Sequence, residues 1–352
     1  MKFDVDELLR FAVEKGASDI HITVGVPPIF RINGQLVKIT DIDRLMPDDT
    51  SVIVESIMTD AVLKTYKEKG EVDFSYSVLG IGRFRVNVYN QRGSASMALR
   101  TVPLKVPTIE DLQLPDTLRK MADHKRGLIL VTGPTGSGKS TTLAAMIDHI
   151  NKTRSSHVLT LEDPIEYLHR HDKSIVNQRE IGLDSMTYGN ALRASLRQDP
   201  DVILIGEMRD LETISTAITA AETGHLVLST LHTTGAVATV DRIVDVFPPS
   251  QQEQIRVQLA AVLQGVVSQQ LLKRADSNGR IAALEILLCN SAIRNHIREG
   301  KSHQMMSSIQ TGRKVGMISM DAYLSDLYKK ELITYEDALN FAIDRDFLSR
   351  LL

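Results

Sequence analysis

The residues with the clearest chemical potential form one short run, Gly133–Ser140 (GPTGSGKS), which fits the pattern G-x-x-x-x-G-K-[ST] in full. Four apolar residues, Leu128–Val131, precede the run as an expected buried strand, and helix formers at Leu143–Ile147 follow it. In a strand, loop and helix of this kind, backbone N–H groups and a helix N-terminus converge on a phosphate chain. An ordinary connecting loop has no need of the Lys–Ser pair. The run therefore predicts a phosphate-binding loop.

Each residue of this loop has an expected task in binding ATP and Mg²⁺, the two predicted cofactors. Lys139 is expected to reach the β- and γ-phosphates, and Ser140 to ligate Mg²⁺ through its hydroxyl. Backbone N–H groups supply most of the remaining phosphate contacts. The other residues predicted to bind nucleotide here are Gly133, Pro134, Thr135, Gly136, Ser137, Gly138 and Thr141.

Further polar residues follow the apolar runs that come later in the chain. The runs Val158–Leu161, Val202–Ile205 and Leu226–Leu228 are short and unbroken, as in a parallel sheet with both faces covered. In such sheets a ligand binds beyond the carboxyl ends of the strands. The catalytic candidates are Lys139 and four residues at these ends: Glu162, Glu166, Glu207 and His232.

The carboxylates after the first of these runs leave two alternatives open. Hydrolysis needs a carboxylate that takes a proton from the attacking water or orients it, and Glu162 and Glu166 are both placed for this. Asp163–Glu166 also fits a helix capping box with proline at the first helical position, which would be a structural role. The residues themselves do not decide between Glu162 and Glu166.

Glu207 and His232 are expected at the ends of the two following strands. Glu207 would hold Mg²⁺ through its waters, although Gly206 occupies the place where many such enzymes carry aspartate. His232 fits a sensor of the γ-phosphate, whereas a lone histidine is more often a structural hydrogen-bonding residue. His225 opens the same expected strand at its far end, so its position favours a function less.

Four arginines are candidates for contacts to the nucleotide. Arg193 and Arg197 are four residues apart and would share one face of a helix, by default a solvated face. Arg85 and Arg100 lie on expected strands near the amino terminus. They would be ordinary surface residues unless a nucleotide is held between two domains, where they could act as arginine fingers.

Length and composition limit the class of protein. The 352 residues suffice for two domains with separate cores, and 43% hydrophobic with 24% charged residues is ordinary for a soluble globular chain. A formal net charge of -3 gives no electrostatic footprint for nucleic acid. The only cysteine, Cys289, excludes a disulfide framework and a zinc site of paired cysteines, which suits a reducing cytoplasm. Any membrane association is expected to be peripheral, since no apolar run is long enough to span.

The order of expected elements divides the chain at a stretch that contains several prolines. Residues 1–104 mix a helix at Val5–Val13, an Asn33-Gly34 hairpin, two further helices and three strands, which predicts a small α+β domain. Residues 105–122 are interpreted as a linker. Residues 123–352 predict an α/β domain of the P-loop NTPase class, with a helical portion from about residue 290.

Several motifs in the same order resemble those of the type II/type IV secretion ATPases, over essentially the whole chain. Within that superfamily the chain is most similar to the retraction ATPases of type IV pili. No additional amino-terminal domain is expected, and the sequence has no four-cysteine insertion. Its stretch Ala292–Glu299 is similar to a retraction signature, with His296 where leucine is usual. The matching stretches are Gly133–Ser140, Glu162–Glu166, Arg197–Asp201, Gly206–Asp210, Thr223–His225 and Leu231–Thr234.

This resemblance implies a PAS-like first domain, a RecA-like second domain and a homohexameric ring with ATP between the domains. It implies that Glu166 is the general base and that Glu207 serves Mg²⁺ and its water. His225 and His232 would form a histidine box. The residues with implied contacts to the nucleotide or the subunit interface are Arg85, Arg100, Arg193 and Arg197.

The implied function is a cytoplasmic motor at the inner membrane. ATP hydrolysis would close the domains and turn an inner-membrane platform protein, which retracts the pilus and drives twitching motility. An accessory retraction paralogue and a type II secretion ATPase are alternatives. A nucleic-acid translocase is disfavoured by 5% aromatic residues and no tryptophan, and a ring that binds nucleotide without turnover is disfavoured by the full set of site residues.

From its residues alone, Ala292–Glu299 predicts an amphipathic helix. Ile293 and Ile297 are expected to be buried, Arg294 and Arg298 exposed, and Ser291 to be a possible N-cap. This structural interpretation stands beside the one in which the helix couples hydrolysis to work on the pilus.

Overall fold

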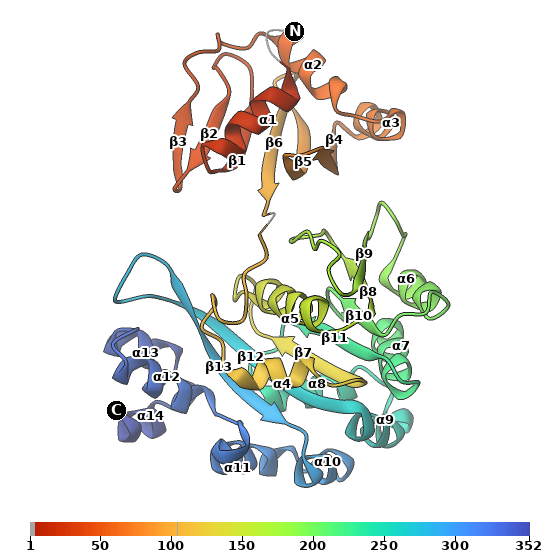
Figure 1. The fold of residues 1–352 in the computed structure, drawn as a ribbon, viewed down its shortest axis with the longest axis vertical. Helices are drawn as coiled ribbons and strands as arrows, with labels where there is room; N and C mark the ends of the chain where they lie inside the picture. The colour runs from red at the N-terminus through yellow and green to blue at the C-terminus, as the bar shows by residue number, and fades with distance from the viewer. Residues whose placement is uncertain (1–3, 104) are drawn as a thin grey trace. The chain divides into compact units, whose positions relative to one another are not determined.

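The computed structural model describes residues 4–103 and 105–352, and these form two compact units (Figure 1). The main body of the first unit ends at Lys105 and the second begins at Val106. Each unit has a hydrophobic core of its own. Across residues 4–103 and 105–352, no helix is both long and apolar enough to cross a membrane.

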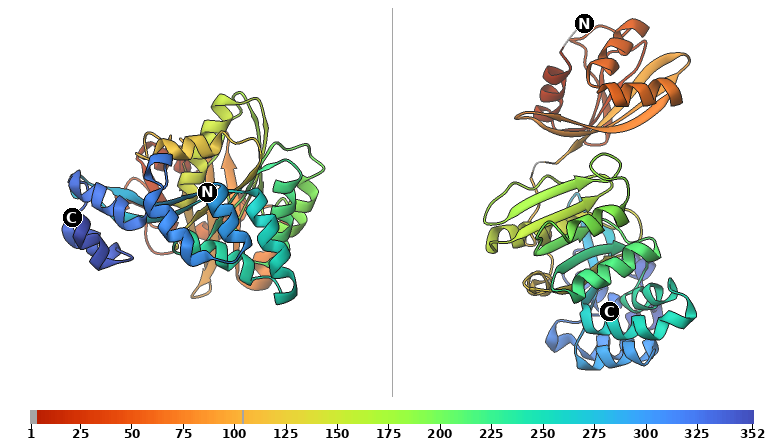
Figure 2. Two further views of the ribbon diagram at one scale, coloured as in Figure 1. Left: turned by 90° about the horizontal axis from the view of Figure 1, so that it is seen from below. Right: turned by 90° about the vertical axis from the view of Figure 1, so that its right-hand side faces the viewer.

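The first unit is the small α+β domain that the sequence predicts. Its six strands are all antiparallel, in the order β3-β2-β1-β6-β5-β4, and the helices pack against one face of the sheet (Figure 2). The elements are α1 (Val5–Glu14), β1 (Ala17–Ile22), β2 (Ile29–Ile32), β3 (Gln35–Lys38), α2 (Pro47–Ser56), α3 (Asp60–Lys69), β4 (Glu71–Val78), β5 (Gly82–Gln91) and β6 (Ser94–Val102).

Local sequence signals explain where these elements begin and turn. Asp4 accepts a hydrogen bond from the Asp6 N–H at 2.8 Å and so caps α1. Asn33 and Gly34 both have positive φ, of 51° and 82°, as a tight turn between twisted antiparallel strands requires. The predicted hairpin is therefore confirmed.

The second unit is built on a seven-stranded sheet in the order β13-β12-β7-β11-β10-β8-β9. Its pairs are parallel except for the antiparallel hairpin of β12 and β13. The strands are β7 (Gly127–Thr132), β8 (His157–Glu162), β9 (Ile175–Glu180), β10 (Val202–Ile205), β11 (Leu226–Leu231), β12 (Leu263–Lys273) and β13 (Arg280–Leu288).

Helices cover both faces of this sheet, which confirms the doubly covered α/β architecture. Leu128 and Leu130 of β7 face one core with α6 to α11, and Ile129 and Val131 face the other with α4 and α5. The helices are α4 (Asp116–Ala122), α5 (Lys139–Thr153), α6 (Tyr188–Ser195), α7 (Leu211–Glu222), α8 (Ala236–Asp245), α9 (Pro249–Val262), α10 (Ser291–Arg298), α11 (Ser302–Thr311), α12 (Met320–Lys329), α13 (Tyr335–Phe341) and α14 (Arg345–Leu351).

The linker expected over residues 105–122 differs from the structure. Ile109, Leu114, Leu118 and Met121 are buried in the core beneath β7, and α4 is one of the covering helices. The prolines of this stretch interrupt the chain, but the apolar residues between them pack against the sheet. The second unit therefore begins at Val106 and comprises residues 106–165 and 169–352.

Strand β9 forms one edge of the sheet, and side chains occupy part of that edge. The Val176 N–H donates to His171 Nδ1 at 3.0 Å, and the Glu180 N–H donates to Asp184 Oδ2 at 2.8 Å. The N–H groups of Ile175 and Ile181 point the other way, to carbonyls of the β8 segment. Two outward donors of the edge are thus already used.

The portion after residue 290 is helical, as predicted, and packs on the β12–β13 hairpin. Glu285 of β13 is fully buried and accepts the Ala236 N–H at 2.7 Å and the Met320 N–H at 3.4 Å. One carboxylate therefore holds the amino termini of α8 and α12. Burial raises the pKa of Glu285, while these two backbone donors act in the opposite direction.

Helix α10 is amphipathic as predicted, with two differences of detail. Ile293 and Ile297 are buried, but Asn290 and not Ser291 is the N-cap, because its Oδ1 accepts the Ile293 N–H at 3.0 Å. Arg298 is exposed, whereas Arg294 is half-buried.

Arg294 turns toward the end of the neighbouring helix. Its guanidinium donates to the carbonyls of Ala260 and Ala261 and, at 3.2 Å, to Gln264 Oε1. These carbonyls lie in the last turn of α9, where no backbone N–H of the same helix remains to bond them. Arg294 is therefore a C-terminal cap of α9.

This cap predicts different outcomes for the two arginines of α10. Arg294→Ala should lower the unfolding free energy by about 2 kcal/mol, because it removes a charged donor from the α9 carbonyls. Arg298→Ala, the matched control on the exposed face, should change it by less than about 0.5 kcal/mol. Thermal unfolding midpoints of both variants measure the difference. Equal midpoints would contradict a capping role.

Candidate nucleotide site

The predicted phosphate loop lies between β7 and α5 (Figure 1). Gly138, the residue before α5, has a φ of 87°, in the left-handed region that favours glycine. Lys139 is only 8% exposed, and its ammonium donates to the carbonyls of Gly133 at 2.9 Å and Pro134 at 3.0 Å. A buried cation and the N-terminus of a fifteen-residue helix therefore meet at this loop.

The sheet register brings the predicted site residues together at the carboxyl ends of the parallel strands. Thr132 pairs with Leu231, so the chain leaves β7 and β11 at the same level, at Gly133 and His232. Ile205 of β10 pairs with Leu161 of β8, one residue before Glu162. The carboxyl ends of the parallel strands thus converge, as the sequence pattern indicates.

Glu207 and His232 contact each other directly. His232 Nε2 lies 3.2 Å from Glu207 Oε2, and Arg209 Nη2 lies 2.7 Å from Glu207 Oε1. The Glu207 side chain is 13% exposed, so its charge is largely shielded from water and balanced by Arg209. Arg209 was missing from the predicted site, although it stands within the Gly206–Asp210 stretch.

Gly206 has a local reason to be glycine. A Cβ at this position would lie 2.7 Å from Tyr188 Oη and 3.2 Å from the Leu161 carbonyl. The tyrosine hydroxyl therefore leaves no room for a side chain at this position. The departure seen in the sequence is explained by packing.

Tyr188, at the start of α6, is a site residue that sequence reasoning missed. Burial, with added effects from the carboxylates of Asp163, Glu207 and Glu162, raises the pKa of Tyr188 well above its ordinary value. Its hydroxyl stays protonated at neutral pH and lies among these acidic groups. No local pattern marks the residue, because α6 reaches the site only through the fold.

Glu162 and Glu166 occupy different settings. Glu162 Oε1 accepts hydrogen bonds from Thr160 Oγ1 at 2.6 Å and Gln178 Nε2 at 3.1 Å, which fix the carboxylate in place. Glu166 is exposed. No helix starts at Asp163, so the capping-box alternative is wrong. The Ile165 N–H donates to Glu180 Oε2 at 3.2 Å and not to a cap.

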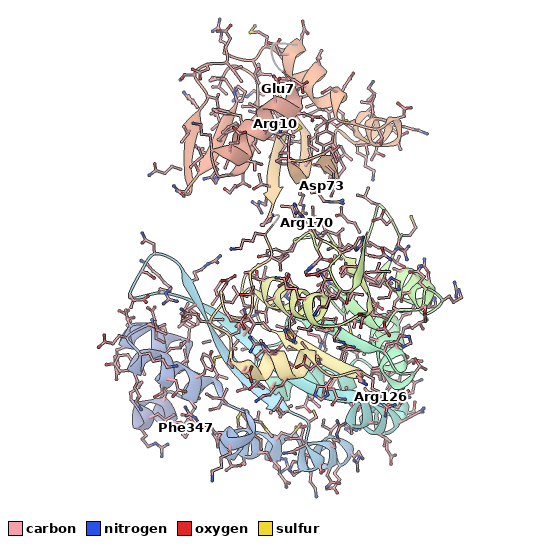
Figure 3. The ribbon with its side chains drawn as sticks, viewed as in Figure 1. Glu7, Arg10, Asp73, Arg126, Arg170 and Phe347 are labelled. Carbon is pink, nitrogen blue, oxygen red and sulfur yellow. The ribbon has the colours of Figure 1, made fainter. Side chains whose placement is uncertain are left out.

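The segment that carries Glu166 is tied to α5 at its far end. Asn151 Nδ2 donates to the Arg170 carbonyl at 2.7 Å, and Asn151 Oδ1 accepts the Asp172 N–H at 3.2 Å. Arg170, labelled in Figure 3, lies on this connection between β8 and β9. The phosphate-loop helix therefore helps to hold the β8–β9 connection.

Two of the predicted arginines lie near the end of α6. Arg193 pairs with Glu212 and donates to Asn190 Oδ1 at 2.7 Å. Arg197 does not share its face, because α6 ends at Ser195 and Arg197 lies in the turn that follows. Both side chains are exposed.

The other two predicted arginines lie in the first unit. Arg85 of β5 and Arg100 of β6 are directly opposite each other, and both are exposed. Arg100 Nε donates to Asp19 Oδ1 at 2.8 Å, and this carboxylate offsets part of the repulsion between the two arginines.

His225 and His232 lie at opposite ends of strand β11. The six residues of β11 separate the two, a span of roughly 20 Å for an extended strand. His225 Nδ1 lies 2.9 Å from the Ala220 carbonyl and 3.2 Å from Thr223 Oγ1. Within one chain, therefore, the two histidines do not form one site.

Comparison with known proteins identifies the family of this chain. A family model described as "Type II/IV secretion system protein" matches residues 2–330. The type IV pilus retraction ATPase PilT of Pseudomonas aeruginosa is 50% identical over 95% of this chain and 97% of its own. The type IV pilus ATPase PilU of the same organism is 43% identical over 96% and 88%.

A solved structure agrees with these matches. The crystal structure of the pilus retraction motor PilT with bound ADP has a TM-score of 0.92 and 51% identity, and the match covers 99% of each chain. The protein therefore belongs to the type II/IV secretion system family, and its two-unit fold is that of the family's ATPases, with a RecA-like second unit.

The contact between Gly206 and Tyr188 gives a prediction for a double variant. Gly206→Ala should destabilise the protein by about 1–3 kcal/mol, because the new methyl group collides with the tyrosine hydroxyl. In a Tyr188→Phe background the same substitution should cost less, since the hydroxyl is gone. Unfolding midpoints of the four proteins test this coupling. An equal loss in both backgrounds would show that another contact excludes the side chain.

Proposed function

We propose that this protein is a Mg²⁺-dependent ATPase motor that retracts type IV pili. The observation that carries the proposal is the near full-length similarity to PilT, 50% identical over 95% of this chain. The phosphate-loop sequence Gly133–Ser140 supports it. The accessory alternative is less favoured, because identity to PilU is 43%. The net charge of -3 argues against a nucleic-acid translocase.

The phosphate loop residues Gly133–Ser140 and Thr141 hold the ATP phosphates in this proposal. Backbone N–H groups and the N-terminus of α5 receive the negative charge, and Lys139 bonds the terminal phosphates. The Ser137 hydroxyl is buried without a hydrogen-bond partner among the described residues, which suits a loop built around a polar ligand.

The residues available for Mg²⁺ fit a hard cation. Ser140 offers a hydroxyl at the start of α5, and Glu207 offers a shielded carboxylate at the same edge of the sheet. Oxygen ligands of this kind, with water and phosphate completing the shell, are those that Mg²⁺ prefers. When bound, the cation would neutralise charge on the phosphates. His232, in contact with Glu207, would sense the γ-phosphate.

Glu166 is the proposed general base. Its carboxylate is exposed and the capping role is absent, so folding of its own segment does not explain it. Glu162 is held by Thr160 and Gln178, which suits a residue that orients its neighbours. In this assignment Glu166 takes the proton from the attacking water and Glu162 supports the arrangement.

Assembly into a homohexamer would give the remaining predicted residues a task. The side chains of Arg85, Arg100, Arg193 and Arg197 are exposed, and His225 lies away from the phosphate loop of its own chain. Contacts to a nucleotide held between domains, or to a neighbouring subunit, would use them. Closure of the domains would turn an inner-membrane platform protein from the cytoplasmic face of the membrane.

A matched pair of variants separates the two carboxylates. Glu166→Gln should lower steady-state ATP hydrolysis by about 10²–10⁴-fold with ATP still bound, because it removes the base and keeps the shape. Glu162→Gln should lower it less, since the amide still accepts the Thr160 hydroxyl. Hydrolysis rates and nucleotide affinities of both variants decide. The reverse order of effects would assign the base to Glu162.

The motor function is tested by complementation. The wild-type protein, expressed in a cell that lacks its retraction ATPase, should restore twitching motility without a second paralogue. Lys139→Ala should fail, because it removes the side chain that bonds the phosphates. Circular dichroism of the variant checks that it is folded. ATPase activity without restored motility would indicate an accessory or secretion role. Normal nucleotide binding by Lys139→Ala would overturn the site assignment.

A further inference from the structure

We infer that Gln269, on β12, is a positioning residue that holds the phosphate loop in its binding shape. The inference rests on the proposed role of Gly133–Ser140. The Gln269 side chain is 2% exposed, so its amide must bond within the protein. Its Oε1 accepts the Thr142 hydroxyl at 2.7 Å and its Nε2 donates to the Ser137 carbonyl at 2.6 Å. A carbonyl only accepts, so Ser137 fixes the amide's orientation.

These two partners lie on either side of the turn from loop to helix. Ser137 comes just before Gly138, and Thr142 is in the first turn of α5. The Ser137–Gly138 peptide is trans, so its N–H points opposite to its C=O. The hydrogen bond from Gln269 therefore directs the Gly138 N–H away from β12 and leaves it for an acceptor on the other side, such as a phosphate.

Gln269 also leaves no room for a side chain at two positions of the loop. A Cβ on Gly133 would lie 2.1 Å from the Gln269 carbonyl oxygen, and a Cβ on Gly138 would lie 2.8 Å from Gln269 Nε2. Ser268 pairs with Thr132, so the next residue of β12 lies beside the start of the loop. The first and last glycines of the loop thus pack on one residue.

The neighbouring residue of β12 holds the loop that follows β11. Ser268 Oγ accepts the Gly235 N–H at 2.9 Å, three residues after His232. Consecutive side chains point to opposite faces of a strand. Strand β12 therefore holds both the phosphate loop and the loop that follows β11. A substitution of Gln269 affects the phosphate loop and leaves the hydrogen bond of Ser268 in place.

The test compares two adjacent glutamines. Gln269→Met keeps the length of the side chain and removes both hydrogen bonds. It should weaken ADP binding, measured by calorimetry, about tenfold or more, because a buried carbonyl and hydroxyl lose their partner. Gln270→Met is the control, since Gln270 donates to the Phe341 carbonyl at 3.3 Å and makes no bond to the loop. Its ADP affinity should match the wild type.

Thr142 and the steady-state kinetics provide two further measurements of the effect of Gln269 on the loop. Thr142→Val removes one of the two bonds and should weaken ADP binding less, which serves if Gln269→Met does not fold. When the ATP concentration is varied, the kcat of Gln269→Met should fall by a smaller factor than its KM for ATP rises, because the residue positions the loop and does not touch reacting atoms. Unchanged ADP affinity in Gln269→Met, or in Thr142→Val where only that variant folds, would overturn the inference.

ADP binding by Lys139→Ala, measured in the same way, separates a failure of the role of Gln269 from a failure of the phosphate-loop assignment. If Lys139→Ala loses ADP binding while Gln269→Met binds normally, the phosphate loop is correctly assigned and Gln269 is not its positioning residue. If Lys139→Ala binds normally, the loop assignment itself is wrong.

Discussion

The pairing of β7 with β11 and β12, in parallel on both sides, is the constraint on which the second unit depends. Every residue of β7 is buried, and its side chains alternate between two cores. A strand covered on both faces holds a charged or polar side chain only where that side chain is hydrogen-bonded, as Glu285 and Gln269 are, because burying such a group unpaired costs several kcal/mol. Most of the predicted site residues accordingly follow the strands, in the loops at their carboxyl ends, and the register decides which loops meet.

The sequence predicted those parts of the fold whose signals are local. The central strands are short apolar runs, and α1 and the Asn33-Gly34 hairpin have caps or turn residues of their own. The β12–β13 hairpin escaped prediction for physical reasons. α9 ends at Val262 and β12 begins at Leu263 with no glycine or proline between them. Strand β12 also carries Ser268 and Gln269, polar residues that are buried because they hold loops.

The same division applies to the site. Lys139 and its loop were predicted because one stretch of chain contains all of the pattern, and Glu207 and His232 because they follow recognisable strands. Tyr188 was not predicted, since only tertiary packing brings α6 to the carboxylates. Arg294 was placed on a solvated face by helical spacing, which carries no information on the open carbonyls of α9 beside it.

The side chains that occupy the edge of β9 bear on how copies of this chain can associate. An edge strand with open N–H and C=O groups is a template for another strand, and repeated pairing of that kind extends without limit into fibres. His171 and Asp184 take the outward N–H groups of Val176 and Glu180, so a foreign strand would have to displace them. Association through a backbone ladder is therefore disfavoured at this edge, so a contact between copies there would use side chains, and a side-chain contact with a fixed rotation can close on itself after a finite number of subunits.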